Sequence, residues 1–275
     1  MPSKPVIISA EQTMAWPDLA EVFRSRALIF MLAKRQIRGR YAQAALGIFW
    51  ALIQPVSYML VLNLFFALTA HFPARAVPYP LFLLSGLLLY QFFVKCVNEG
   101  AGSLTGNEAL LGKIFLPRLI FPIVPIAVAS IDLAVSLSLF IILYFIFGFM
   151  FPLKAVLALG VLAVFFVLAI GMAILLSALC ARYKDLRLAL PTITQLLFFS
   201  SPIVYDVTLV PEKYWLIWGL NPLVGLIPAL RWCVFENVEP PSLALFAMSV
   251  AIALIVLVVG LFYFHRVERD LVDAL

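Results

Sequence analysis

Residues Leu119 to Phe151 read LIFPIVPIAVASIDLAVSLSLFIILYFIFGFMF, and Asp132 is the only charged residue in this run. A helix of about 20 apolar residues spans the hydrocarbon core of a bilayer, so the run is long enough to cross it. Because lipid offers the backbone no hydrogen-bond partners, a crossing segment of this kind must be helical. The run therefore predicts a membrane-spanning helix.

The rest of the chain has the same character. Of its 275 residues, 65% are hydrophobic and 12% are charged, whereas soluble domains are about half apolar and about a quarter charged. This composition excludes a water-soluble enzyme. The net charge of +5 does not indicate nucleic acid as a partner, because the basic residues lie between apolar runs instead of on one soluble face. We expect membrane lipids around the chain.

Six apolar runs are candidate spans: Leu46 to Ala70, Pro80 to Val97, Leu119 to Phe151, Leu153 to Ala181, Leu186 to Val204 and Leu243 to Phe264. Lys and Arg accumulate in cytoplasmic loops of membrane proteins. With the N-terminus inside, the outer side holds only Arg75, Lys154, Lys213 and Arg231. The sequence predicts an all-α integral membrane protein with about six transmembrane helices and both termini in the cytoplasm.

The N-terminal segment does not fit a plain span. Residues Asp18 to Arg40 predict one helix, on which Arg24, Lys34, Arg35 and Arg38 share one arc. Such a helix is typical of the membrane surface. We therefore divide the chain into a cytoplasmic segment, 1–40, with an amphipathic interface helix, and a transmembrane domain, 41–275.

Two further segments are interrupted. Glu99 to Lys113 contains four glycines around the apolar piece Ala109 to Leu111, and predicts a small cytoplasmic helix. Tyr205 to Phe235 is semi-apolar, aromatic and broken by prolines. A full crossing there would push the C-terminus outside, so we expect a re-entrant outer hairpin before the last span, with its broken backbone buried or facing water.

Catalytic motifs are weak. Gly106 to Lys113 reads GNEALLGK, which has five residues between its glycines where a P-loop has four, and no Ser or Thr after the lysine. His71 and His265 fall at opposite ends of the topology, so neither a metal site nor a histidine base is expected. The three cysteines, Cys96, Cys180 and Cys233, form no CxxC pair and are read as packing residues. We expect no metal, no cofactor and no catalysis in this chain.

A stripe of polar and aromatic residues follows two of the predicted spans. Helical spacing places Trp50, Gln54, Tyr58 and Phe65 on one side of the first, and Thr192, Gln195 and Phe199 on one side of the fifth. The stripe fits the wall of a water-filled route on which sugar rings stack. It fits equally well ordinary helix packing with an interfacial aromatic belt.

Asp132 is costly inside a membrane and is therefore a functional candidate. A structural role is favoured, with the carboxyl either neutral or bonded to Ser130, Ser136 or a neighbouring helix.

Five ordered blocks carry a resemblance to a known family. They are RYAQAALGIFWALIQP (Arg40 to Pro55), VPYPLFLLSGLLLYQFF (Val77 to Phe93), KIFLPRLIFP (Lys113 to Pro122), ALCARYKDLRLALP (Ala178 to Pro191) and SSPIVYDVTLVPEKYWLIWGLNPLVGLIPALR (Ser200 to Arg231). In this order they resemble the membrane subunit of bacterial ATP-binding-cassette exporters for lipid-linked polysaccharide, such as O-antigen, teichoic acid or capsule.

The resemblance implies a permease of the bacterial cytoplasmic membrane that pairs with a second copy of itself and with two copies of an ATPase subunit, which binds the ATP and Mg. It implies that the interface helix and a coupling helix at about 104–113 contact the ATPase, with Leu104, Leu110, Leu111 and Lys113 as candidates. It also implies an outer gate at about 207–231, for which Tyr205, Trp215 and Trp218 are candidates.

A basic inner rim of Arg35, Arg38 and Arg40 would suit the polyprenyl pyrophosphate anchor of such a polymer, because the planar guanidinium binds phosphate oxygens in pairs. The same charges also serve as topology signals and pair with anionic lipid. The LGIFW and FLPR blocks resemble the O-antigen and teichoic acid exporters more than the capsule branch.

Three other functions stay open. A drug or small-lipid exporter would keep this architecture but have a narrow apolar cavity. A membrane enzyme or proton-coupled carrier would use Asp132, although the chain lacks the paired intramembrane ionisable groups of proton relays. A structural scaffold would explain neither the re-entrant segment nor the docking elements.

Overall fold

The computed structural model describes residues 19–41, 46–69, 77–107 and 117–273. The described residues contain helices and no strand. The helices are α1 (Leu19–Arg24), α2 (Arg26–Tyr41), α3 (Trp50–Thr69), α4 (Tyr79–Ala101), α6 (Ile120–Ile146), α7 (Ala158–Arg182), α8 (Lys184–Ser200), α9 (Trp215–Trp218), α10 (Leu223–Val234) and α11 (Leu243–Asp273). The all-α prediction is confirmed for these residues.

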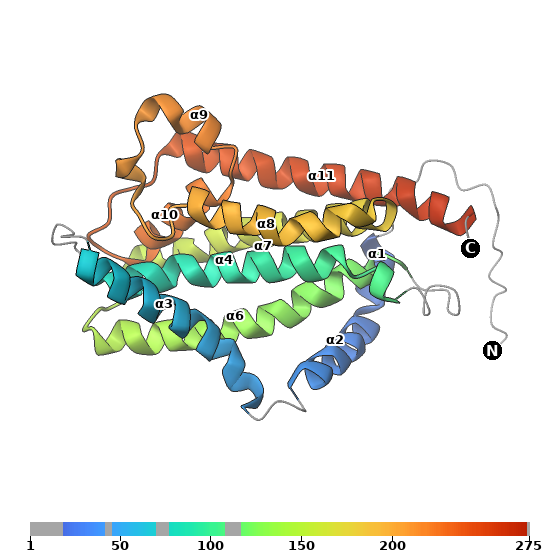
Figure 1. The fold of residues 1–275 in the computed structure, drawn as a ribbon, viewed down its shortest axis with the longest axis horizontal. Coiled ribbons are helices and arrows are strands. Elements are labelled where there is room, and N and C mark those ends of the chain that lie inside the picture. Colours follow the sequence, from blue (N-terminus) through green and yellow to red (C-terminus); the bar gives the residue numbers. More distant parts are fainter. Residues whose placement is uncertain (1–18, 42–45, 70–76, 108–116, 274–275) are drawn as a thin grey trace.

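The long helices run side by side and form one bundle, in which α3 is tilted across the others (Figure 1). The helices differ sharply in burial. In α4, 72% of the most apolar window is buried, whereas in α11 only 28% of the corresponding window is buried. A helix that is apolar all round is stable in the centre of a bundle, whereas one in a membrane can also face lipid. We place α4 at the centre of the bundle and α11 at its edge.

Each of the six predicted spans corresponds to a helix, but the helices differ in their fitness to cross a membrane. Four of the described helices are long and apolar enough: α4, α6, α7 with its preceding turn, and α11. The apolar part of α3 (Trp50–Phe65) is shorter, and α8 has 17 residues. A bent pair formed by Glu212–Trp218 and Leu223–Val234 would make a fifth candidate. The structure thus confirms several apolar spans, while the number six stays a prediction.

Two glycines let α7 and α11 approach closely. A Cβ added at Gly171 would lie 2.7 Å from the backbone nitrogen of Leu257, and one at Gly260 would lie 2.8 Å from the carbonyl oxygen of Gly171. Small residues allow this backbone contact between helices in lipid, where packing replaces the hydrophobic effect as the force between helices.

The two ends of the bundle have different contents. One end carries α9 and α10, which bend by 110° at their junction. The other end carries α1, the junction of α7 and α8, and the end of α11 (Figure 1). The junction of α7 and α8 contains the basic residues Arg182 and Lys184, and the predicted orientation places this end in the cytoplasm.

The predicted interface helix is interrupted. Instead of one helix from Asp18 to Arg40, the structure has α1 and α2 separated by a turn at Ser25, whose backbone nitrogen donates to the carbonyl of Val22. One side of α2 packs on α6, with Ala33 buried against Ile120 and Val124. This helix therefore rests on protein along its apolar face.

Candidate functional site

A pocket of about 460 Å³ opens between α3, α4 and α8. Four of the residues predicted to line a route are in its wall: Gln54 and Tyr58 from α3, and Gln195 and Phe199 from α8. These residues are far apart in the sequence, and the fold brings them together. The wall combines amide groups with aromatic rings.

The other three predicted residues do not line this pocket. Trp50 and Phe65 lie on the same helix as Tyr58 and have exposed fractions of 51% and 57%. Thr192 is exposed on α8. The predicted stripe therefore divides into a pocket wall and an exposed aromatic face, and the roles of all seven residues stay predictions.

Helix α4 supplies pocket residues that the sequence reasoning missed: Tyr90, Gln91, Lys95 and Asn98. The spacing of four and three residues between Gln91, Lys95 and Asn98 along one helical face was a usable signal, but the apolar run around them masked it. The hydroxyl of Tyr90 donates to the carbonyl of Thr194 at 2.6 Å, and this bond joins α4 to α8. The side-chain nitrogen of Gln91 is buried without a hydrogen-bond partner among the described residues.

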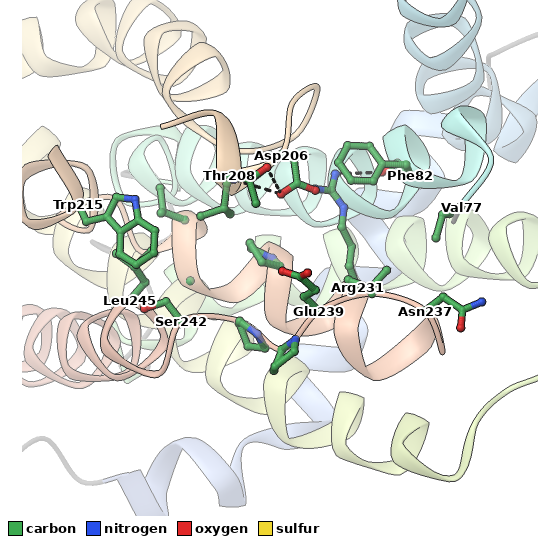
Figure 2. A pocket seen from close by; sticks show the side chains of 17 residues that line it. Val77, Phe82, Asp206, Thr208, Trp215, Arg231, Asn237, Glu239, Ser242 and Leu245 are labelled. Carbon is green, nitrogen blue, oxygen red and sulfur yellow. Dashed lines mark hydrogen bonds between the residues drawn. The ribbon is translucent and has the colours of Figure 1, made fainter. Parts of the chain in front are cut away.

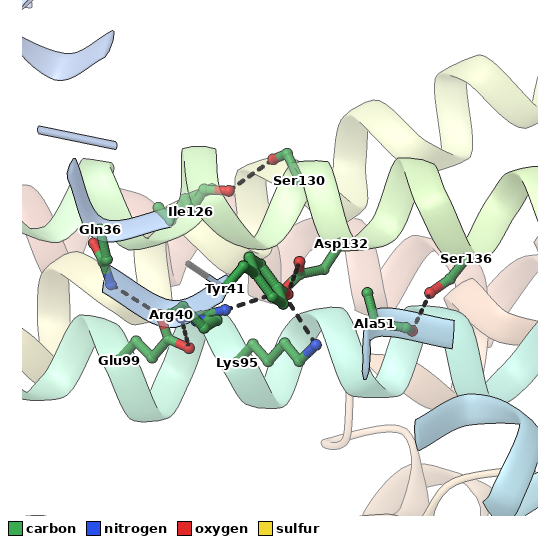
Figure 3. A network of polar contacts seen from close by, with 10 residues as sticks. All are labelled: Gln36, Arg40, Tyr41, Ala51, Lys95, Glu99, Ile126, Ser130, Asp132 and Ser136. Carbon is green, nitrogen blue, oxygen red and sulfur yellow. Dashed lines mark hydrogen bonds and ion pairs between the residues drawn. The ribbon is translucent and has the colours of Figure 1, made fainter. Parts of the chain in front are cut away.

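A network of charged side chains lies where the end of α2 meets α4 and α6 (Figure 3). Asp132 accepts hydrogen bonds from the Tyr41 hydroxyl at 2.6 Å and from Arg40 at 3.0 Å, and Lys95 lies 3.2 Å away. Glu99 accepts from Arg40 at 2.5 Å and from Gln36 at 3.2 Å. The network joins the end of α2 to α4 and α6.

Two sequence-based assignments change here. Lys95, which was counted among cytoplasmic loop charges, lies within α4 and pairs with Asp132. Neither serine proposed for Asp132 is its partner: Ser130 donates to Ile126 of its own helix, and Ser136 donates to Ala51. The partners come from neighbouring segments, which is the remaining predicted arrangement.

Burial and the hydrogen bond to Asp132 raise the pKa of Tyr41 to about 12. The phenol is therefore protonated across the physiological range and donates a hydrogen bond to the carboxylate. The raised pKa means that this bond weakens only as pH rises towards 12.

The three arginines of the predicted inner rim have different surroundings. Arg40 is held by Glu99 and Asp132. Arg35 lines a second pocket, of about 480 Å³, together with Asn98 and Arg187. Arg38 is exposed. The carboxylates of Glu99 and Asp132 already pair with Arg40. Of the three arginines, Arg35 therefore has the guanidinium that is best placed to meet a phosphate.

The predicted coupling segment is only partly described. Leu110, Leu111 and Lys113 lie outside the described residues. Leu104 is buried against Leu119, Ile174 and Phe264. It anchors its segment within the chain and does not offer its side chain to a partner in this arrangement, so a contact with an ATPase would have to involve neighbouring residues.

Two of the three candidate gate residues contact each other at the end of the bundle that carries α9 and α10. The rings of Tyr205 and Trp218 stack with centroids 6.2 Å apart. The Trp218 indole donates to Ser200 at 2.6 Å, and the Trp215 indole donates to Val210 at 3.0 Å. The first bond ties the bent pair to the last residue of α8, and the second ties it to the segment that follows α8.

A pocket of about 440 Å³ lies beneath this segment (Figure 2). Its lining includes Asp206, Trp215, Arg231 and Glu239. Arg231, predicted to be an outer loop charge, is instead buried in α10. Its guanidinium donates to Ser85 and to the carbonyls of Phe82, Pro202 and Ile203, and lies 3.5 Å above the centre of the Phe82 ring.

Comparison with known proteins adds the following findings. The model of a family described as "ABC-2 type transporter" matches residues 27–235. An O-antigen export system permease protein RfbA of Myxococcus xanthus is 26% identical over 238 residues, which cover 84% of this chain and 90% of the relative. One from Klebsiella pneumoniae is 23% identical over 252 residues, covering 90% and 95%. The polysialic acid transport protein KpsM of Escherichia coli is 27% identical over 252 residues, covering 87% and 93%.

Proposed function

The chain belongs to the ABC-2 type transporter family, and on this basis we propose that it is the membrane subunit of an ATP-driven exporter that moves a polysaccharide out across the bacterial cytoplasmic membrane. Relatives that cover most of this chain are named as O-antigen export permeases and polysialic acid transport proteins. The hydrolysis of ATP is assigned to a separate ATPase subunit.

The observation that carries this proposal is the pocket between α3, α4 and α8. Its amide groups, Gln54, Gln91, Asn98 and Gln195, match the hydroxyl groups of a sugar, and rings such as Tyr58 offer a face to its C–H groups. The buried side-chain nitrogen of Gln91 lacks a hydrogen-bond partner among the described residues, and a movement of this side chain into the pocket would let a sugar hydroxyl accept a hydrogen bond from it. A drug exporter would be expected to have a narrower and more apolar cavity.

The proposed topology has six crossings with both termini in the cytoplasm. The shorter helix α8 runs alongside the four apolar ones and α3 crosses them at a tilt (Figure 1), which supports counting both as spans. The 110° bend between α9 and α10 supports a re-entrant hairpin. We also retain the proposed division at residue 40, since α2 ends at Tyr41.

A lipid-linked substrate is the finer part of the proposal. Arg35 and Arg187 line one pocket at the inner end and have no ion pair with another described residue, so two guanidinium groups can meet a pyrophosphate. The assignment to the O-antigen type rests on the LGIFW and FLPR blocks, because O-antigen and polysialic acid relatives have similar identities to this chain.

Assembly with a second copy is supported by exposed apolar side chains on α3 and α8. Leu64, Phe65, Leu196 and Phe199 have exposed fractions between 57% and 67%, and exposed apolar patches mark lipid or protein contacts. A homodimer would enclose the pocket between two copies. An ATPase would then drive export through the cytoplasmic segment 104–113 and through α1 and α2.

A deletion strain tests the proposed function. Without this chain, surface polysaccharide should be lost and its lipid-linked precursor should accumulate inside the cell. Alanine at both Tyr58 and Phe199 should lower export by about tenfold or more, because two aromatic contacts of about 1 kcal/mol each are lost. Surface and internal polymer would be measured by gel and by antibody.

The matched control is Ile142→Ala, on the exposed face of α6 and away from the pocket. It should export at the wild-type rate. Normal surface polysaccharide in the deletion strain would contradict the proposed function, and a loss of drug efflux in its place would support the drug exporter.

A further inference from the structure

Asp132 is buried, with an exposed fraction of 3%, and it is the centre of three contacts from two other segments. Tyr41 and Arg40 reach it from the last residues of α2, and Lys95 reaches it from α4 (Figure 3). A charge buried in a membrane protein is costly unless it is paired. The pairing of Asp132 is therefore a strong constraint on the three segments that meet there.

The same face of α6 also holds the start of α3. Ser136 lies one helical turn after Asp132 and donates to the backbone carbonyl of Ala51 at 3.1 Å. Asp132 thus fixes the residue at the end of α2, and Ser136 fixes the beginning of α3. Between them, these two side chains hold both sides of the connection from α2 to α3.

Lys95 extends the arrangement to the substrate pocket. Its ammonium group pairs with Asp132, and its side chain lines the pocket between α3, α4 and α8. Tyr58 of α3 lines the same pocket. The carboxylate therefore positions a pocket residue on α4, while Ser136 on the same face of α6 holds the start of the helix that carries Tyr58.

The charges of the network balance. Arg40 and Lys95 carry two positive charges, and Glu99 and Asp132 carry two negative charges, all within ion-pair distance. Arg40 bridges both carboxylates, so it joins α4 to α6 through the end of α2. Removal of Asp132 alone would leave an excess positive charge, whereas removal of both Asp132 and Lys95 would restore balance but not the contact between Arg40 and α6.

We propose that Asp132 is a positioning residue for export, because its carboxylate fixes the end of α2 and Lys95 and thereby sets the inner end of the substrate pocket. This role rests on the proposed polysaccharide export. It differs from the use of an intramembrane acid as a proton carrier, because the carboxylate acts here through its contacts with Tyr41, Arg40 and Lys95.

Two measurements on the full chain test this role. The first is hydrogen exchange of residues 34–41 in the purified protein in lipid nanodiscs. The second is export of the polysaccharide in cells, relative to the amount of the protein in the membrane. Asp132→Asn should speed exchange in α2 by about tenfold, equivalent to about 1.4 kcal/mol of lost local stability, and should lower export by a similar factor.

The double variant Asp132→Asn with Lys95→Gln separates positioning from charge balance. It should fold as well as wild type because the network is neutral again, yet its export should remain low. Asp132→Glu should restore part of the export, because the negative charge returns. Ser130→Ala is the matched control, since this hydroxyl donates within its own helix, and it should change neither measurement.

If Asp132→Asn does not reach the membrane, Tyr41→Phe decides the question. It removes one hydroxyl from the network without changing any charge, and should lower export and speed exchange by about threefold, equivalent to about 0.7 kcal/mol, which lies at the lower end of the range for one net hydrogen bond. Wild-type export by the double variant, or unchanged export and exchange in Tyr41→Phe, would overturn the positioning role. Absence of polysaccharide export by the wild-type protein would instead overturn the proposed function, and exchange would still report whether the network holds α2.

Discussion

Arg231 is a buried cation whose hydrogen bonds hold the start of α4 to the segment after α8. Its guanidinium donates to the carbonyls of Phe82, Pro202 and Ile203. Replacement by Met removes these donors and leaves buried carbonyl groups unsatisfied, at about 1 to 3 kcal/mol for each group. We expect Arg231→Met to lower the free energy of unfolding by about 3 kcal/mol or more, measured by denaturant titration in detergent.

Lys213→Met is the control for this substitution. Lys213 is exposed and lies 4.8 Å from the centre of the Tyr214 ring, so its loss should change the free energy of unfolding by less than about 1 kcal/mol. Equal effects of the two substitutions would contradict a stabilising role for the bonds of Arg231.

Single residues were predictable where their type was unusual for their place. Asp132 was found because an acid within an apolar run is rare. Its partners were not found, because Tyr41 and Arg40 lie 91 and 92 residues away in the sequence and only the fold brings them near. Lys95 and Arg231 looked like loop charges because a sequence does not reveal which basic residues find buried acceptors.

The contact between α7 and α11 gives a prediction about helix packing. Gly171→Val would place new atoms less than 3 Å from the backbone of Leu257, and a backbone has little room to yield. Overpacking of this kind costs about 1 to 3 kcal/mol. Thermal unfolding in detergent should therefore show a lower melting temperature for Gly171→Val.

Gly160→Val on the same helix is the matched control. A Cβ at Gly160 meets nothing within 4 Å, so the melting temperature should stay near that of wild type. If both variants melted at the same temperature as wild type, the close approach of α7 and α11 at Gly171 would be wrong.

The sequence predicted where the helices lie along the chain better than it predicted how they pack against one another. Hydropathy predicted a helix at each of the six runs, because length and apolar composition are local properties. The turn at Ser25 was missed, since α1 and α2 together keep a continuous helical pattern. The burial of α4 was also missed, because an apolar helix reads the same whether lipid or protein surrounds it.

For the whole molecule, the ordered sequence blocks identified the family, and the match over residues 27–235 confirms that identification. The candidate pocket was only half predictable. Spacing along α3 and α8 grouped residues within each helix. That Tyr58, Tyr90 and Phe199 line one pocket depends on how the three helices pack. The role of the exposed face that carries Trp50 and Phe65 depends further on what covers this face in an assembly.

The orientation of the whole bundle can be tested with cysteine labelling of intact cells and of inverted vesicles. Cysteine at Lys213, in the exposed segment before α9, should react with a membrane-impermeant maleimide from outside, whereas cysteine at Lys184 should react only in inverted vesicles. The natural residues Cys96, Cys180 and Cys233 are all buried, so background labelling should be low without their removal. The two sites lie near opposite ends of the bundle, and the basic residues near Lys184 favour the cytoplasmic side. Labelling of Lys213→Cys exclusively in inverted vesicles would reverse the orientation and place the proposed outer gate in the cytoplasm.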